Sequence, residues 1–419
     1  MLKLPSMHDF GHDAKLLIVV TGVLAVSFFG IFGLLGVLYL LRLGYGPEYI
    51  GIYSAIGALT YMSMGVPSGI LGTRLGARTT MLAGGGIAAI GMALLPLAEF
   101  VPLAWRDLWP FFSQVILTIG WSMFNVNLVP ALMISTTDWN RNAAFALSSA
   151  FRETGTLAGM FVGGLLPEMF AGLFAQPLNA PAPYRYSLWV GAAMAAVALV
   201  PLRRFKATAI PARRTHADKP RSAAPVLPIA LMAAYIFIRH AGWATCQSFC
   251  NAYMDADLHL STSSIGLITS VVQVAAIGAS LLTPYVMARC NNGGALLIAT
   301  LGVAVSLLPM GLIPHWTAAS IGRIGFQVSS AMWITVLQVF QMELVDSEWR
   351  ALTYGITSMA MGFGFGSFSL ASGYIITTFG YRSAFLVGAG LELASAAVLW
   401  GILRKRKRTV LPPALEPVS

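Results

Sequence analysis

Charged side chains are what this chain most lacks. Only 10% of its 419 residues are Asp, Glu, Lys or Arg, whereas 57% are hydrophobic and the mean hydropathy is +0.74. A typical soluble domain carries about 25% charged residues. The composition therefore excludes an ordinary soluble globular protein and indicates a chain that resides in lipid.

Cysteines and enzyme motifs are also scarce. Of the three cysteines, Cys246 and Cys250 lie four residues apart on one predicted helix, where a disulfide is geometrically unfavourable, so we interpret them as small packing residues. The chain has no Gly-x-x-x-x-Gly-Lys-Ser/Thr loop, no His-Glu-x-x-His and no cysteine pair at zinc spacing. The sequence thus predicts no enzymatic activity, no cofactor and no metal site.

Long apolar segments are abundant. A helix that crosses a hydrocarbon core of about 30 Å needs roughly 20 apolar residues, and twelve segments qualify. They lie near 16–41, 49–72, 79–98, 109–135, 143–167, 186–202, 228–254, 263–287, 294–313, 316–341, 352–378 and 384–403. We therefore predict an all-α integral membrane protein with twelve transmembrane helices.

The two halves of the chain share landmarks. Residues 43–74 align on 258–289 at an offset of 215, and the segment from Arg141 aligns on that from Arg350 at an offset of 209. Parallel repeats of this kind build one large class of secondary transporters. We expect an N-terminal six-helix bundle over 1–202, a basic cytoplasmic linker over 203–224, and a C-terminal six-helix bundle with a basic tail over 225–419.

The distribution of basic residues predicts the orientation. Nineteen Lys and Arg fall on the side of the termini and four on the other side, and the positive-inside rule makes both termini cytoplasmic. The net charge of +10 is thus explained by topology and contact with anionic lipid rather than by nucleic-acid binding. Because no predicted external loop carries an Asn-x-Ser/Thr site, we expect a multi-pass protein of the bacterial inner (plasma) membrane.

The loop after the second segment carries a recognisable motif. Residues 69–78 read Gly-Ile-Leu-Gly-Thr-Arg-Leu-Gly-Ala-Arg, which resembles the Gly-x-Leu-x-Asp-Arg-x-Gly-x-Arg loop of the major facilitator superfamily, with Thr73 in place of the acid. The resemblance implies the major facilitator fold and a cytoplasmic gate that includes Gly69, Arg74, Gly76 and Arg78.

A second motif lies on the fifth segment. Gly155, Gly159 and Gly163 recur every four residues, which gives a smooth face for close helix contact. The stretch resembles the family's antiporter motif, with Met160 replacing its proline. The resemblance places these three glycines at the contact between the two halves. Helix packing without any significance for export is the alternative.

Polar residues within the spans are the guide to the substrate, because lipid penalises them. In the resembled fold, helices one, four, seven and ten line a central cavity. The candidate substrate-binding residues on the fourth, seventh and tenth segments are Gln114, Trp121, Asn125, Arg239, His240, Trp243, Gln247, Asn251, Arg323 and Gln327. A structural, backbone-paired arginine is the alternative for Arg239.

Acids are rarer still within the spans. Glu153 and Glu392 are the deep ones, and the first segment has none. Glu153 is our candidate coupling acid. Its neighbour Arg152 points about 100° away around a helix, so the two cannot be assumed to pair.

These observations together predict a secondary active transporter that works by alternating access. Efflux of an amphiphilic or drug-like compound is the leading interpretation. Uptake or exchange of a small organic anion is the alternative, favoured by Arg239 and Arg323, and a non-transporting membrane sensor or scaffold is a remote third. The expected partners are a small-molecule substrate, a coupling proton or ion, and the bilayer, with a monomeric protein and no nucleic acid.

Overall fold

The computed structural model describes residues 10–137, 140–205, 225–345 and 349–410, and every regular element assigned within these ranges is helical. The helices form twelve long segments, which confirms the predicted all-α fold. Ten of the described segments are long and apolar enough to cross a membrane by themselves.

The N-terminal half begins with a composite span. It consists of α1 (His12–Ala25), a π-helical stretch η2 (Val26–Phe32) and α2 (Gly33–Arg42). The other elements are α3 (Pro47–Leu75), α4 (Ala77–Leu94) with its 3-10 extension η3 (Leu95–Phe100), the short α5 (Leu103–Arg106), α6 (Trp109–Ile134), α7 (Arg141–Leu173) and α8 (Pro181–Leu202).

The C-terminal half contains α9 (Val226–Ala256), α10 (Thr262–Leu312), α11 (Trp316–Leu344), α12 (Arg350–Phe379) and α13 (Tyr381–Val410). The element α10 consists of two helices joined at a kink, where Asn291 has non-helical dihedral angles, with a φ of 55° and a ψ of 170°. The break separates α10 into the two spans predicted near 263–287 and 294–313.

The two halves form separate bundles that meet along α3 with α12, α7 with α10, and α2 with α9. The division into bundles over 1–202 and 225–419 stays a prediction. Residues 206–224 of the predicted linker lie outside the described residues.

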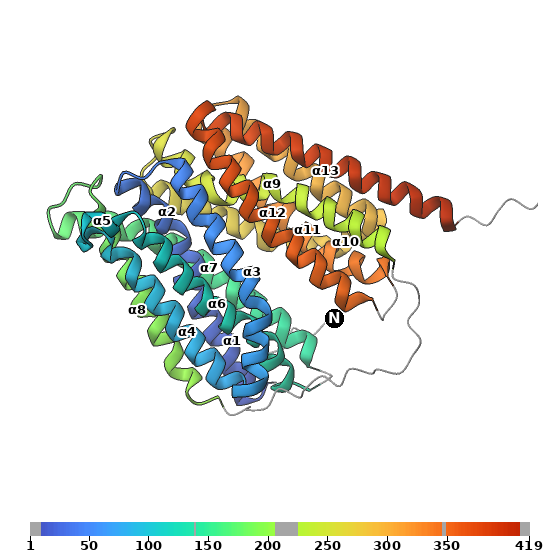
Figure 1. Ribbon diagram of the computed structural model, residues 1–419, viewed down its shortest axis with the longest axis horizontal. Coiled ribbons are helices and arrows are strands. Elements are labelled where there is room, and N and C mark those ends of the chain that lie inside the picture. The colour runs from blue at the N-terminus through green and yellow to red at the C-terminus, as the bar shows by residue number, and fades with distance from the viewer. Residues whose placement is uncertain (1–9, 138–139, 206–224, 346–348, 411–419) are drawn as a thin grey trace, which may run out of the picture.

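The contacts between the halves lie from the middle of the spans to the end away from the termini. A Cβ added to Gly51 would lie 2.7 Å from the carbonyl oxygen of Ser369, and one on Gly164 would lie 2.8 Å from Cα of Gly266. Such small residues let helix backbones approach closely. Toward the N-terminus and the carboxyl end of α13 the bundles diverge (Figure 1). The structure is therefore closed at one end and splayed at the other.

The predicted interdomain glycine face lies elsewhere. A Cβ on Gly155 or Gly159 would clash with backbone carbonyls of the first span, and one on Gly163 would lie 3.2 Å from Cα of Ile31. All three thus pack within their own half, and the prediction that they lie between the halves is wrong. The next residue, Gly164, is turned about 100° around the helix and meets the other half instead.

Candidate functional site

An aromatic cluster joins the first span to α6. The ring of Trp121 stacks on Phe28, with centroids 4.1 Å apart, and meets Phe29 edge-on at 5.2 Å. Both phenylalanines belong to the π-helical stretch η2, and π-helical turns recur at functional sites. All three side chains are only half-buried. We call Phe28, Phe29 and Trp121 the aromatic wall, because they offer a flat apolar surface that remains accessible.

The other predicted residues of α6 face α3. Asn125 donates a hydrogen bond of 2.8 Å to the hydroxyl of Tyr61. The amide of Gln114 packs directly against Gly57, where a Cβ would clash with it. Oε1 of Gln114 has no hydrogen-bond partner among the described residues. The stripe predicted on α6 therefore forms one polar and aromatic surface with α3 and the first span.

Arg239 and His240 on α9 are both 1% exposed. The guanidinium of Arg239 lies 3.9 Å from the ring centroid of Trp333, and its Nη2 donates to Ser330 at 3.4 Å. Nδ1 of His240 is 2.7 Å from the carbonyl oxygen of Ile236. Both predicted contact residues are thus held inside the C-terminal bundle in this conformation.

Arg323 on α11 is also buried, at 3% exposure. Its Nη1 donates to the carbonyl oxygen of Cys246 at 3.1 Å and lies 3.2 Å from the sulfur of the same residue. Cys246 consequently has a polar partner, in addition to the packing role that the sequence indicated.

The remaining predicted residues of the C-terminal half differ in accessibility. Gln247 is exposed, Trp243 and Gln327 are half-buried, and Asn251 is 8% exposed with an unpartnered Oδ1 among the described residues. The ten candidate residues therefore do not form one shell. The aromatic and amide side chains of this set are accessible or half-buried, whereas the two arginines are buried.

The predicted gate lies at the splayed end. Gly76 separates α3 from α4 with a φ of 84°, a conformation that favours glycine. Arg78 donates a hydrogen bond to the backbone carbonyl of Arg203, at the end of α8. Arg74 is exposed in the last turn of α3, and Gly69 lies earlier on the same helix. The contact of Arg78 is thus within its own half.

The sequence did not reveal an ion pair at the closed end. Arg42, the last residue of α2, donates two hydrogen bonds to Asp255 near the end of α9, at 2.7 and 2.6 Å. Arg42 also donates to the hydroxyl of Tyr184, which is 2.7 Å from Thr262. The separation of 213 residues between Arg42 and Asp255 falls between the two repeat offsets. Arg42 and Asp255 therefore occupy corresponding positions, at the end of the first span of each half. This correspondence between the repeats could have identified the pair.

The two acids predicted to lie deep in the spans, Glu153 and Glu392, differ in their contacts. Glu153 accepts a hydrogen bond from Gln273 of the other half and pairs with Arg152 at 3.1 Å, which two long side chains achieve despite their divergent directions. Glu392 on α13 is 0% exposed, and neither of its carboxyl oxygens has a hydrogen-bond partner among the described residues.

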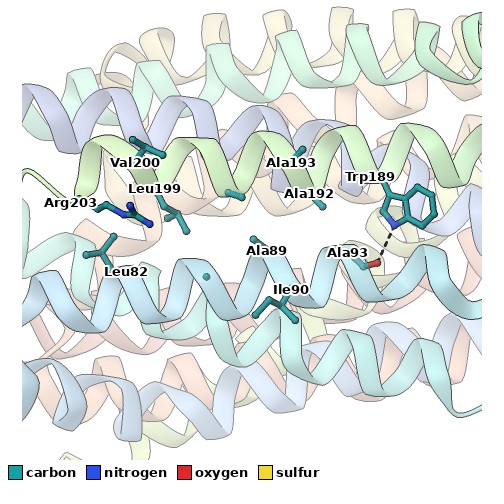
Figure 2. Close-up of a pocket in the computed structure, with 12 residues that line it drawn as sticks. Leu82, Ala89, Ile90, Ala93, Trp189, Ala192, Ala193, Leu199, Val200 and Arg203 are labelled. Carbon is teal, nitrogen blue, oxygen red and sulfur yellow. Dashed lines mark hydrogen bonds between the residues drawn. The ribbon is translucent and has the colours of Figure 1, made fainter.

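A groove of about 760 Å³ lies outside this region, between α4 and α8 (Figure 2). Its lining is mainly small and apolar, with Arg203 at one end and Trp189 at the other, where the indole donates to the carbonyl of Ala93 at 3.2 Å. Because both helices belong to one half, this groove is not the central site.

Comparisons with known proteins agree with this architecture. The family model of the Major Facilitator Superfamily matches residues 17–250 and 232–417. The chain is 23% identical over 144 residues to the Multidrug resistance protein MdtH of Proteus mirabilis (strain HI4320), an alignment that covers 34% of each protein.

Solved structures share the fold along nearly the whole chain. A variant of the nucleoside transporter NupG superimposes with a TM-score of 0.73 at 17% identity, covering 93% of this chain and 99% of NupG. A bacterial homologue of the human lysosomal transporter Spinster, in an inward-facing and unoccupied conformation, gives 0.77 at 11% identity, covering 96% and 98% of the two chains.

Proposed function

The chain belongs to the Major Facilitator Superfamily, and on that premise we propose that it exports an amphiphilic, drug-like compound by alternating access. The protein is a multi-pass membrane transporter rather than an enzyme. In the proposed cycle, the two bundles rock about a central cavity and expose it to one side of the membrane at a time.

One observation carries the proposed substrate class. The aromatic wall is half-buried, whereas Arg239 and Arg323 are 1% and 3% exposed and engaged with Trp333 and Cys246. A ligand that enters the cavity would therefore meet aromatic rings and amides such as Gln247 before any cation. Predominantly apolar and aromatic lining with a few polar groups is typical of small-molecule sites and favours an amphiphile.

The direction of transport is proposed to be outward. The limited similarity to a protein named for multidrug resistance supports efflux. The splayed end carries Arg74, Arg78 and Arg203, so the positive-inside rule would make it cytoplasmic. The cavity would then be open to the cytoplasm of an inner membrane, as loading for export requires.

The alternative substrate is a small organic anion. The observation that favours it is that Nε of Arg239 and Nε of Arg323 both lack hydrogen-bond partners among the described residues. If an anion turned one of these guanidinium groups toward the cavity, the group could donate two hydrogen bonds to it. Arg239→Lys and Arg239→Gln separate the two cases, because an anion should bind more weakly to both variants and most weakly to Gln. An uncharged amphiphile should tolerate Gln.

Binding to the aromatic wall is tested with thermal-shift titrations of anionic, cationic and neutral amphiphiles. A ligand that binds only the folded protein raises its melting temperature. Trp121→Ala should weaken binding of the best amphiphile about tenfold, which corresponds to the loss of roughly 1.4 kcal/mol of stacking. The matched control is Trp400→Ala, because Trp400 is 49% exposed on α13. Equal affinity in Trp121→Ala and wild type would contradict the proposed site.

Orientation is tested by thiol labelling of intact cells in a Cys290→Ser background, since Cys246 and Cys250 are 0% exposed. An impermeant maleimide should label Asn179→Cys at the closed end and should not label Thr79→Cys at the splayed end. The reverse pattern would overturn the proposed topology.

A further inference from the structure

A buried acid on α13, Glu392, takes no part in the proposed substrate site. Glu392 lies about 16 Å along the helix from Tyr381, near the middle of a hydrocarbon core of about 30 Å. It is 0% exposed, and neither carboxyl oxygen has a hydrogen-bond partner among the described residues. The side chain lies against α9, because a Cβ on Gly242 would come within 2.6 Å of its Cγ and 2.7 Å of its Oε1.

The groups that face this carboxyl come from three helices. The charged or titratable side chains within electrostatic reach are Arg239 and Tyr235, both on α9. From α10, Leu307 approaches the same point. On its own helix, the hydroxyl of Ser395 donates to the backbone carbonyl of Glu392 at 2.8 Å and leaves the carboxyl free.

Both α9 groups are engaged elsewhere. The hydroxyl of Tyr235 lies 2.7 Å from Thr300 and accepts a hydrogen bond from Trp333 at 2.7 Å. The guanidinium of Arg239 lies over the ring of Trp333 and donates to Ser330. Within the described part of the chain, no direct ion pair joins Arg239 to Glu392.

The two charge states of Glu392 fit this geometry differently. An ionised carboxylate without hydrogen bonds in an apolar interior is strongly disfavoured, so the arrangement suits a neutral acid. The positive charge of Arg239 is meanwhile stabilised by the face of Trp333. Once Glu392 is ionised, Arg239 is the cation within reach, and its Nε is still without a partner among the described residues.

We propose that Glu392 is the proton-carrying site of the transport cycle, and that its ionisation draws Arg239 away from Trp333 and onto the carboxylate. The proton passes between the carboxyl group and cavity water, and no other bond is made or broken. The ring of Trp333 meets His240 edge-on at 5.8 Å, and His240 meets the half-buried Trp243 edge-on at 5.1 Å, so a shift of Arg239 would be transmitted to an accessible side chain. This inference rests on the proposed transport function and assigns the coupling to Glu392 rather than to Glu153, which is 33% exposed and paired with Arg152.

The first test needs no substrate. Infrared difference spectra of the full-length protein in lipid nanodiscs are recorded as the pH is raised. Wild type should lose the carbonyl band of one buried protonated carboxyl, and Glu392→Gln should lack that band. The exposed Glu168 and the rival Glu153 provide the control variants Glu168→Gln and Glu153→Gln, which should keep it. Gly242→Ala should shift its frequency, because the added methyl group would occupy the place of the carboxyl. A band that persists in Glu392→Gln, or no such band in wild type, overturns the proposal.

The second test measures coupling with ethidium as the probe in proteoliposomes clamped at zero membrane potential. With one proton per cycle, a gradient of one pH unit sustains about tenfold accumulation, since 1.4 kcal/mol corresponds to a factor of ten. Glu392→Gln should still exchange ethidium across the membrane, but the pH gradient should produce no accumulation of it. Full accumulation by Glu392→Gln overturns the proposal. Ethidium movement absent from wild type would count against drug export, while the infrared test still decides the role of Glu392. If Glu392→Gln also loses exchange, Glu392→Asp decides the question. A shifted carboxyl band together with coupled transport in Glu392→Asp supports the proposal, and the absence of both refutes it.

Discussion

The ion pair between Arg42 and Asp255 should hold the closed end of the transporter together. Its two hydrogen bonds cross from one half to the other, and the side chains are 18% and 5% exposed. An ion pair with charge-assisted hydrogen bonds in such a partly buried position contributes about 2 kcal/mol in total to the closed state. Removing the pair should therefore raise the population opened at this end about 30-fold.

The population is measured as the labelling rate of Thr262→Cys by an impermeant maleimide, in a Cys290→Ser background. Thr262 is 1% exposed, and its hydroxyl lies 2.7 Å from the hydroxyl of Tyr184 in the other half, so labelling requires the halves to separate. Arg42→Gln and Asp255→Asn should each accelerate labelling about 30-fold. The double variant should add little, because each single change already removes the interaction.

A matched control exists at the same end. Arg185 and Glu99 form an ion pair of 2.8 Å with exposures of 12% and 16%, but both belong to the N-terminal half. Arg185→Gln should lower thermal stability without changing the labelling rate. Equal acceleration by Arg185→Gln and Arg42→Gln, or none by either, would refute the assignment of Arg42 and Asp255 to closure.

Three further predictions concern the gate, the pH response and the packing of the first span. Arg74→Ala should slow transport while leaving ligand binding intact, as measured by paired flux and thermal-shift assays; an unchanged flux would leave Arg74 as a topology charge only. A hydrogen bond from Thr377 lowers the pKa of Glu48, so closure is favoured at neutral pH and weakens as the external pH falls through the lowered pKa. Labelling of Thr262→Cys should accordingly rise at acidic pH on the closed side, and Glu48→Gln should abolish that dependence. Gly159→Ala should destabilise the protein by about 1–3 kcal/mol through overpacking against the first span, and a melting temperature equal to that of wild type would contradict the described contact.

Much of the fold could be predicted because lipid restricts the backbone to a few solutions. Each span must satisfy its own hydrogen bonds as a helix, so apolar length alone located the twelve long helical segments but not the short α5. The kink at Asn291 falls between the segments predicted near 263–287 and 294–313. The repeat offsets then indicated two bundles running in the same direction.

The site was harder to predict, because side-chain direction depends on which helix lies opposite. The glycines of α7 were correctly seen as a packing face, but nothing in their spacing says whether the first span or the other half covers them. The π-helical turn that brings Phe28 and Phe29 against Trp121 has no marker in the apolar stretch Val26–Phe32. Arg239 was predicted as a substrate contact, yet its stacking on Trp333 depends on two helices that are distant in sequence.

The central claim is that transport requires the two halves to separate at the end where they now touch. Glu48 and Thr377 meet there across the halves, so Glu48→Cys/Thr377→Cys can be joined by a short thiol cross-linker in a Cys290→Ser background. Cross-linking should abolish ethidium transport in proteoliposomes, and reduction of a reducible linker should restore it. The same linker should leave transport by either single-cysteine variant unchanged. Transport that continues at the full rate in the cross-linked protein would contradict alternating access by these two bundles.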